Sequence, residues 1–156
     1  MTKIERSALV MFSAEQMFDL VNDVASYPQF LPGCRGAEVL FQDDETLEAR
    51  LDLARAGITQ SFVTRNGLQR PQTMTLTLVD GPFSSFNGVW TFTPLAENAC
   101  KVAFTLAFEV SNRLLGAAVG KLFGGIANQM VDAMCERAGK IYGEKPVGGK
   151  PLGEKQ

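Results

Sequence analysis

Side chains suited to acid–base or metal chemistry are few and scattered in this sequence of 156 residues. No histidine is present, which excludes Ser-His and Cys-His nucleophilic machinery and nearly every catalytic zinc site. The three cysteines, Cys34, Cys100 and Cys135, are far apart and include no Cys-x-x-Cys pair. They therefore predict reduced thiols in a cytosolic protein, and not disulfides or a metal ribbon.

Carboxylates number 17, but most fall at turns or on the polar faces of strands and helices, where a solvated surface explains them. The polar residues that can point inward are Tyr27, Arg35, Arg65 and Glu109. An acid–base enzyme needs two titratable groups in one apolar pocket. The sequence shows no such pair, so we expect a binding protein with no catalytic residue, no metal and no cofactor.

The segment at 27–34, YPQFLPGC, is apolar although its two prolines forbid a regular helix or a central strand. A surface loop would be more polar. One interpretation is a lid over the mouth of an internal tunnel, with Phe30 and Leu31 turned inward and the prolines limiting the entropy lost on ordering. The other interpretation is a fixed lid that closes an ordinary core.

A second group of apolar side chains recurs with strand and helix periods and should face a common interior. Aromatic and Met stripes are ordinary core material, so a packed core and a ligand pocket both account for them. The residues inferred from the two periods are Phe62, Met74, Leu76, Phe86, Trp90, Phe104 and Phe108 from strands, with Leu122, Ile126, Met130 and Met134 from a helix.

Glycines follow one another at intervals of four in the first part of the C-terminal helix, at Gly116, Gly120 and Gly124, with Gly125 next. Each costs roughly 1 kcal/mol relative to Ala in a helix interior. They leave room for a ligand, form a hinge at a cavity mouth, or allow close packing on a sheet; alternatively the regular helix begins only after Gly125. Gly88 similarly predicts a strand bulge or a close approach of a ligand.

The order of the elements follows from the hydrophobic periods. Residues 3–11 predict a strand, Ser13 with Gln16 predicts a capping box that starts a helix, and a short helical turn is expected at 24–27. Period-two alternation from 34 to 110 predicts six antiparallel strands with turns at 43–45, 66–67, 80–82 and 97–98. Period 3.6 then predicts a long helix at 112–143.

These elements make an α+β domain at 1–143, in which a curved antiparallel sheet of about seven strands wraps around one long C-terminal helix. Two small helices follow the first strand. The Gly-, Pro- and Lys-rich residues 144–156 predict a disordered tail. The net charge of −2 gives no case for DNA binding. Polar residues interrupt the apolar stretch at 114–131, which disfavours a membrane span, so we expect a soluble cytoplasmic protein.

Four stretches of the sequence resemble the coenzyme Q-binding START-like family, whose bacterial branch includes ribosome association toxins. They are LVNDVASYPQFLPGC at 20–34, SFVTRN at 61–66, LVDGPFSSFNGVWTF at 78–92 and ANQMVDAMCERAGKIYG at 127–143. The Tyr-Pro…Leu-Pro-x-Cys motif matches Tyr27 to Cys34, and the Gly-Pro-Phe…Trp-x-Phe motif matches Gly81 to Phe92. Met134 departs from the family pattern, where Phe is common.

The resemblance implies a START-like helix-grip fold with a tunnel that binds ubiquinone or a similar isoprenoid lipid in support of respiration. It also implies two alternatives: binding of the large ribosomal subunit that blocks subunit association, and an aromatase/cyclase-like enzyme. Peripheral contact with the inner membrane belongs to the first reading. The candidate ligand contacts are Tyr27, Phe30, Leu31, Phe62, Leu76, Phe83, Phe86, Trp90, Phe104, Leu122, Ile126, Met130 and Met134.

Overall fold

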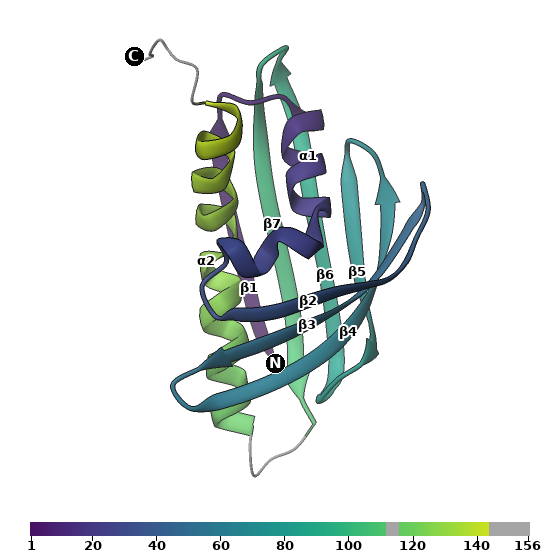
Figure 1. Cartoon of the computed structure of the whole chain (residues 1–156), viewed down its shortest axis with the longest axis vertical. Helices are drawn as coiled ribbons and strands as arrows, with labels where there is room; N and C mark the ends of the chain where they lie inside the picture. The colour runs from purple at the N-terminus through teal and green to yellow at the C-terminus, as the bar shows by residue number, and fades with distance from the viewer. Residues whose placement is uncertain (112–115, 144–156) are drawn as a thin grey trace.

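A curved antiparallel sheet and one long helix form the two layers of the protein (Figure 1). The computed structural model describes residues 1–111 and 116–143. In these ranges the elements are β1 (Thr2–Val10), α1 (Ala14–Asn22), the 3-10 helix η1 (Val24–Gln29), β2 (Cys34–Gln42), β3 (Thr46–Arg55), β4 (Ile58–Gln69), β5 (Thr73–Asp80), β6 (Phe83–Ala96), β7 (Ala99–Val110) and α2 (Gly116–Tyr142).

The seven described strands follow the order β1-β7-β6-β5-β4-β3-β2, and all neighbours are antiparallel. Strands β2 to β7 form a meander, and β1 returns to pair with β7 along its whole length. Helix α2 contacts β1, β7, β3 and β4, so both ends of the curved sheet meet it (Figure 1). The predicted α+β helix-grip architecture is confirmed.

The first helix begins where the sequence predicts it. Ser13 Oγ accepts from the backbone N–H of Gln16 at 3.1 Å, and Gln16 Oε1 accepts from the backbone N–H of Ser13 at 2.9 Å. The next helical segment is longer than predicted, because η1 runs through Pro28 to Gln29. A short 3-10 helix has few i→i+3 bonds to lose, so it tolerates a proline that an α-helix would not.

Three of the four predicted turns are present, and the turn predicted at Asn66-Gly67 is wrong. Both residues lie inside β4, where Asn66 pairs with Leu76 and Gly67 pairs with Thr75. The chain instead turns at residues 70–72, between β4 and β5. The β3–β4 hairpin turns at Ala56 and Gly57, both with positive φ. Asn-Gly is a common turn signal. Here the Asn66 side chain faces inward, and a Cβ at Gly67 would lie 2.8 Å from the Thr75 hydroxyl, so both residues fit within the strand.

The glycines of α2 lie within one continuous helix, so the prediction that the regular helix starts only after Gly125 is wrong. A Cβ atom at Gly116, Gly120 or Gly124 would meet nothing within 4 Å, so close packing on the sheet does not explain these three. Gly125 differs because it lies against the guanidinium of Arg55. The predicted helix residues 112–115 and the predicted tail 144–156 lie outside the described residues.

Candidate functional site

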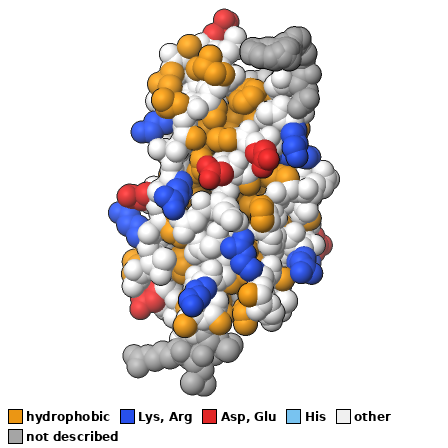
Figure 2. Space-filling view, turned by 90° about the vertical axis from the view of Figure 1, so that its left-hand side faces the viewer, with side chains coloured by type: hydrophobic (Ala, Val, Ile, Leu, Met, Phe, Trp, Pro, Cys, Tyr) orange, Lys and Arg blue, Asp and Glu red, His pale blue; other side chains and the backbone are white. Residues whose placement is uncertain are grey.

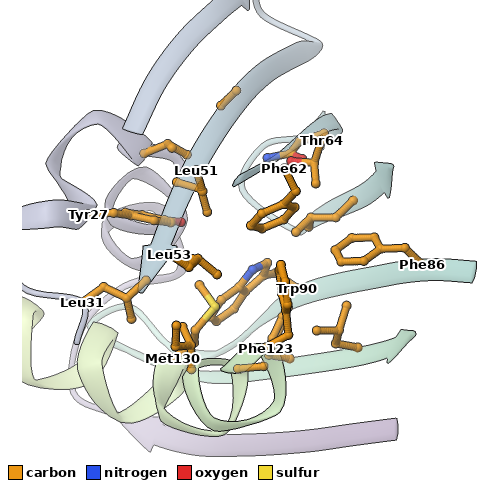
Figure 3. Close-up of a pocket in the computed structure, with 18 of the residues that line it drawn as sticks. Tyr27, Leu31, Leu51, Leu53, Phe62, Thr64, Phe86, Trp90, Phe123 and Met130 are labelled. Atoms are coloured by element: carbon orange, nitrogen blue, oxygen red, sulfur yellow. The ribbon is translucent and has the colours of Figure 1, made fainter. Parts of the chain in front are cut away.

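An apolar pocket lies between the concave face of the sheet and α2, and it encloses a cavity of about 60 Å³ (Figure 3). A dry cavity of roughly 150 Å³ lined by Leu, Ile and Phe binds benzene. The space is therefore mostly filled by side chains, and a ring-sized ligand requires some of them to move. Met130, Leu51 and Phe86 are half-buried lining residues, so they can yield at lower cost than the fully buried ones.

Nine of the thirteen predicted contact residues line this pocket. Strands β4 to β7 contribute five, η1 and the segment after it contribute two, and α2 contributes two. They are Tyr27, Leu31, Phe62, Leu76, Phe86, Trp90, Phe104, Ile126 and Met130. Contact of these residues with a ligand remains a prediction.

The other four predicted contacts lie elsewhere. Phe83 and Met134 are buried in the surrounding core, and Leu122 faces a separate surface depression beside Arg55. Phe30 is half-buried and packs outside the pocket. The helical period places Leu122 and Met134 on the buried side of α2, but the described α2 residues that line the pocket are Phe123, Ile126, Ala127 and Met130.

Several lining residues are not among those predicted from the sequence, and two of them are polar. Thr64 and Asn66 are 7% and 4% exposed, and both face inward from β4. The signal was present, because Phe62, Thr64, Asn66 and Leu68 alternate along one strand face, but the turn assigned to Asn66 hid it. The other missed residues are Val24, Ala49, Leu51, Leu53, Leu106, Phe123 and Ala127.

Aromatic side chains fix the pocket wall where α2 crosses the sheet. The Phe123 ring of α2 lies edge to face on Phe62, with ring centroids 4.9 Å apart, and on Phe83, at 4.6 Å. Across the pocket the Trp90 and Phe104 rings are stacked at 4.4 Å. Such pairs stabilise by about 0.5–1.5 kcal/mol beyond their buried area. The Phe123 contacts tie α2 to β4 and β6 at this part of the pocket wall.

Gly88 lies on the same sheet face, between Phe86 and Trp90, and neither a bulge nor a pocket position is found there. It pairs in register with Leu76 and Leu106. A Cβ at Gly88 would lie 3.3 Å from Cβ of Leu76 and 3.4 Å from Cδ1 of Leu106. Because Gly88 has no side chain, the two lining leucines on the neighbouring strands can approach each other across β6.

Tyr27 presents its ring to the pocket, while its hydroxyl donates to the backbone carbonyl of Val21. Burial is the main cause that raises the pKa of this phenol above its usual range, with smaller contributions from the thiol of Cys34 and the carboxylate of Asp23. The hydroxyl is neutral and already paired. Tyr27 therefore serves as a structural wall with a satisfied polar end.

The proline segment, residues 27–34, closes one side of the pocket. Leu31 is 3% exposed and lines the cavity. Gly33 has φ of 89°, and a Cβ there would lie 2.7 Å from Cδ1 of Ile126 on α2. The segment can approach the helix this closely only because residue 33 is Gly. Phe30, predicted to turn inward, does not line the cavity: its half-buried ring packs against the edge of the core and beside Arg137.

The polar residues considered for catalysis do not meet in the pocket. Arg65 is exposed and pairs with Glu48 at 2.9 Å, Glu109 is exposed, and Arg35 borders a surface depression beside Asp52. Among the described lining residues, Tyr27 is the one titratable group. Within residues 1–111 and 116–143, no three His, Cys, Asp or Glu side chains lie together as a metal site requires.

The three cysteines are free thiols that form no disulfide in the structure, and burial raises the pKa of each. In the same described ranges no helix has the length and apolar character needed to cross a membrane. The arrangement can hold an apolar molecule between sheet and helix, with two polar side chains of β4 at one part of the wall.

Relatives of similar length share close to half of their residues with this chain. The ribosome association toxin RatA of Vibrio cholerae is 50% identical over 92% of this chain and 100% of its own length. RatA of Escherichia coli K12 is 48% identical over 91% of this chain and 90% of its own. The mitochondrial coenzyme Q-binding protein COQ10 homolog B of Xenopus laevis is 29% identical and is matched over 59% of its length.

Solved structures share the fold at lower sequence identity. The Zhui aromatase/cyclase of a Streptomyces species superposes with a TM-score of 0.76 at 15% identity, covering 94% of this chain and 99% of that chain. A START superfamily protein of Mycobacterium smegmatis superposes with a TM-score of 0.74 at 23% identity, covering 89% and 98%. These two likenesses show the helix-grip fold alone.

A family profile agrees with both comparisons. The model of the family described as "polyketide cyclase / dehydrase and lipid transport" matches residues 10–135. This range includes every strand from β2 to β7, η1 and most of α2. The chain therefore belongs to the START-like polyketide cyclase, dehydrase and lipid transport family.

Proposed function

We propose that the protein binds an amphipathic lipid of the isoprenoid quinone class in the pocket between the sheet and α2. The observation that carries this proposal is the lining, which is apolar except for Thr64 and Asn66 on β4 and is covered by both layers of the fold. A ring with an isoprenoid tail matches that distribution. The 29% identical relative named as a coenzyme Q-binding protein supports the same ligand class.

Organic extraction of the purified full-length chain, followed by mass spectrometry, tests this proposal. We expect an isoprenoid quinone of the expression host, and quenching of Trp90 fluorescence when a decyl-tailed quinone is added to lipid-free protein. Trp90 is the single tryptophan and lines the pocket, so its emission reports on that site. Protein that carries no lipid and binds no quinone up to its solubility limit contradicts the proposal.

A pocket-filling variant separates interior binding from adhesion to the surface. Ala127 lines the pocket and is 4% exposed, so Ala127→Leu fills space that the ligand needs. Ala133 lies on the same helix, is buried and does not line the pocket. We expect Ala127→Leu to weaken quinone binding at least tenfold and Ala133→Ser to leave it within twofold.

Association with the ribosome is a second candidate function, and the named relatives favour it. Two RatA proteins match at 50% and 48% identity over at least 90% of each chain, which is higher than the identity to the coenzyme Q-binding relative. Internal lipid binding and ribosome binding use different parts of the molecule. The two activities are therefore compatible in one protein.

The end of the molecule at the β3–β4 turn offers cations for such a contact. Arg55 and Lys121 border one surface depression, and Arg35 borders the next. Figure 2 shows Lys and Arg side chains spread over the lower half of the face that carries α2. Cationic side chains contact RNA phosphates, and such binding weakens steeply with salt.

Sucrose-gradient profiles of separated ribosomal subunits with added full-length protein test this second function. We expect the protein to sediment with the large subunit and to reduce the formation of whole ribosomes at low salt. Lys121→Glu should weaken this effect, and Lys101→Glu on β7 is the charge-matched control. Unchanged subunit association at low salt would rule the activity out.

A further inference from the structure

Asn66 is a buried amide whose oxygen lacks a partner. Its side chain is 4% exposed and faces inward from the middle of β4, where its neighbours in register are Leu47 on β3 and Leu76 on β5. Oδ1 has no hydrogen-bond partner among the described residues. Nδ2 lies 4.0 Å from Sδ of Met74, and a thioether is a weak acceptor.

Such an amide destabilises the fold unless something binds it. An unsatisfied buried polar group lowers the stability of the fold by about 1–3 kcal/mol. The residues paired with Asn66 are leucines, so an apolar side chain would suit this position better. The next inward residue on the same strand is Thr64, which is also buried and also lines the pocket. We call Thr64 and Asn66 the polar strip. Two adjacent inward polar positions on an otherwise apolar wall point to a ligand group.

The polar strip lies at one end of the pocket. Figure 3 shows Thr64 beyond Phe62, on the far side of the pocket from Leu31 and Met130, while the indole nitrogen of Trp90 points toward the space below Phe62. A hydroxyl and an indole N–H both donate hydrogen bonds, and the Asn66 oxygen accepts one. This end of the pocket therefore suits a group that both donates and accepts, with the apolar remainder directed toward α2.

We propose that the polar strip is a head-group subsite for a ring hydroxyl, so that the pocket prefers the reduced, hydroquinone form of its lipid to the quinone. The proposal rests on the quinone-class ligand proposed above. Quinone carbonyls only accept hydrogen bonds, and they leave Asn66 Oδ1 unpaired. A hydroquinone O–H donates to Oδ1 while its oxygen accepts from Thr64 or Trp90. In the alternative orientation of the Asn66 amide, with Oδ1 and Nδ2 exchanged, the oxygen would lie against the Met74 sulfur.

Three probes with the same ring and the same decyl tail test this preference under anaerobic conditions: the quinone, the hydroquinone and the hydroquinone dimethyl ether. Binding to the lipid-free full-length protein is measured by titration calorimetry. We expect the hydroquinone to bind at least about tenfold more tightly than the quinone, as one buried hydrogen bond implies. The dimethyl ether, which cannot donate, should gain no such advantage.

Asn66→Leu removes the acceptor and keeps a similar volume. We expect it to lose the preference for the hydroquinone over the quinone, and to be at least as stable as the natural protein without ligand. Thr64→Val is the second variant and should reduce the preference by a smaller factor. It also keeps the test open if Asn66→Leu fails to fold.

The outcomes separate this inference from the proposed function. Failure to bind all three probes overturns the quinone-class function itself. Equal binding of all three probes, or a hydroquinone preference that survives in Asn66→Leu, overturns the head-group subsite while the function stands. A large loss of stability in ligand-free Asn66→Leu, together with an undiminished preference in Thr64→Val, also overturns the subsite and leaves Asn66 a structural amide.

Discussion

The guanidinium of Arg137 on α2 lies over the Phe30 ring, 5.1 Å from its centroid. The same group donates from Nη2 to Oε1 of Gln29 at 3.0 Å, and Phe30 also meets Tyr27 edge to face. One side chain of α2 thus holds two consecutive residues at the outer side of the proline segment, while Leu31 closes the pocket on the inner side. Release of this contact would loosen the wall without emptying the core.

Phe30→Ala tests whether the proline segment gates the pocket. We expect the free energy of unfolding to fall by about 1–2 kcal/mol, because a cation–π contact and an aromatic pair are lost at a half-buried site. Dissociation of a bound decyl quinone should become several-fold faster, measured by stopped-flow recovery of Trp90 fluorescence. A variant that unfolds more easily but releases the quinone at the natural rate would show a fixed lid.

Gly33→Ala should destabilise the protein more than Gly57→Ala, which is its matched control. Both glycines have positive φ, at 89° and 84°, so each substitution places Ala in the left-handed region at about 1–2 kcal/mol. A Cβ at Gly57 meets nothing within 4 Å, whereas one at Gly33 meets Cδ1 of Ile126. Urea denaturation of both variants measures the difference.

A further substitution identifies the cause of that difference. Ile126→Val removes the Cδ1 methyl, 2.7 Å from the new Cβ, and keeps Cγ1, 3.0 Å from it. In the background of Ile126→Val, we expect the excess cost of Gly33→Ala over Gly57→Ala to shrink. An undiminished excess in this background would show that the backbone of the proline segment, and not contact with α2, sets the requirement for Gly33.

Most of the fold could be predicted from the sequence because its signals are local. Period-two alternation in the strands and the Ser13–Gln16 capping box each specify their element without knowledge of the rest. The prediction failed at Asn66-Gly67, where a turn-forming pair sits inside β4. A local turn preference of about 1 kcal/mol is smaller than the gain from completing a 12-residue strand between two partners.

The candidate site was less predictable than the fold, because a pocket depends on which part of a buried face stays unfilled. Met134 and Ile126 lie on the same buried side of α2, yet only Ile126 lines the pocket. The period gives the buried face of α2, but the pocket uses only the middle of that helix, from Phe123 to Met130. Phe123 was missed for the complementary reason, since it falls one position outside the predicted stripe.

Tyr27→Phe should change how stability depends on alkaline pH. Burial raises the pKa of the Tyr27 phenol in the folded state, so the folded protein holds this proton more tightly than the unfolded chain, whose phenol has a pKa of about 10. The stability contributed by the neutral phenol is present below about pH 10 and is lost as the pH rises above that value. Tyr27→Phe has no phenol at this position, so it should not lose this stability at alkaline pH.

Urea denaturation of both proteins between pH 8 and pH 11 measures the effect. At pH 8, Tyr27→Phe should be less stable by about 1–2 kcal/mol, because the Val21 carbonyl loses its donor. The gap should narrow above pH 10. The buried thiols titrate in both proteins, so they cancel in the comparison, and parallel curves would show that Tyr27 does not carry the alkaline sensitivity.

Gly124→Ala and Gly125→Ala are adjacent substitutions with different expected effects. Ala in place of Gly in a helix interior stabilises by about 0.5–1 kcal/mol when the new methyl has room, and a Cβ at Gly124 meets nothing within 4 Å. At Gly125 the new methyl meets the guanidinium of Arg55, which donates to Gln129 at 2.7 Å. The end of the Arg55 side chain can shift, but at the cost of this hydrogen bond, so we expect Gly124→Ala to raise the melting temperature more than Gly125→Ala does.

The same pair shows whether the glycines make α2 a hinge at the pocket. If helix flexibility at this point admits the ligand, Gly124→Ala should slow association of the decyl quinone several-fold while it stabilises the fold, because the helix resists the bending that opens the wall. Stopped-flow quenching of Trp90 measures the association rate. An unchanged rate in a stabilised Gly124→Ala protein would place the entry route away from α2, on the side of the proline segment.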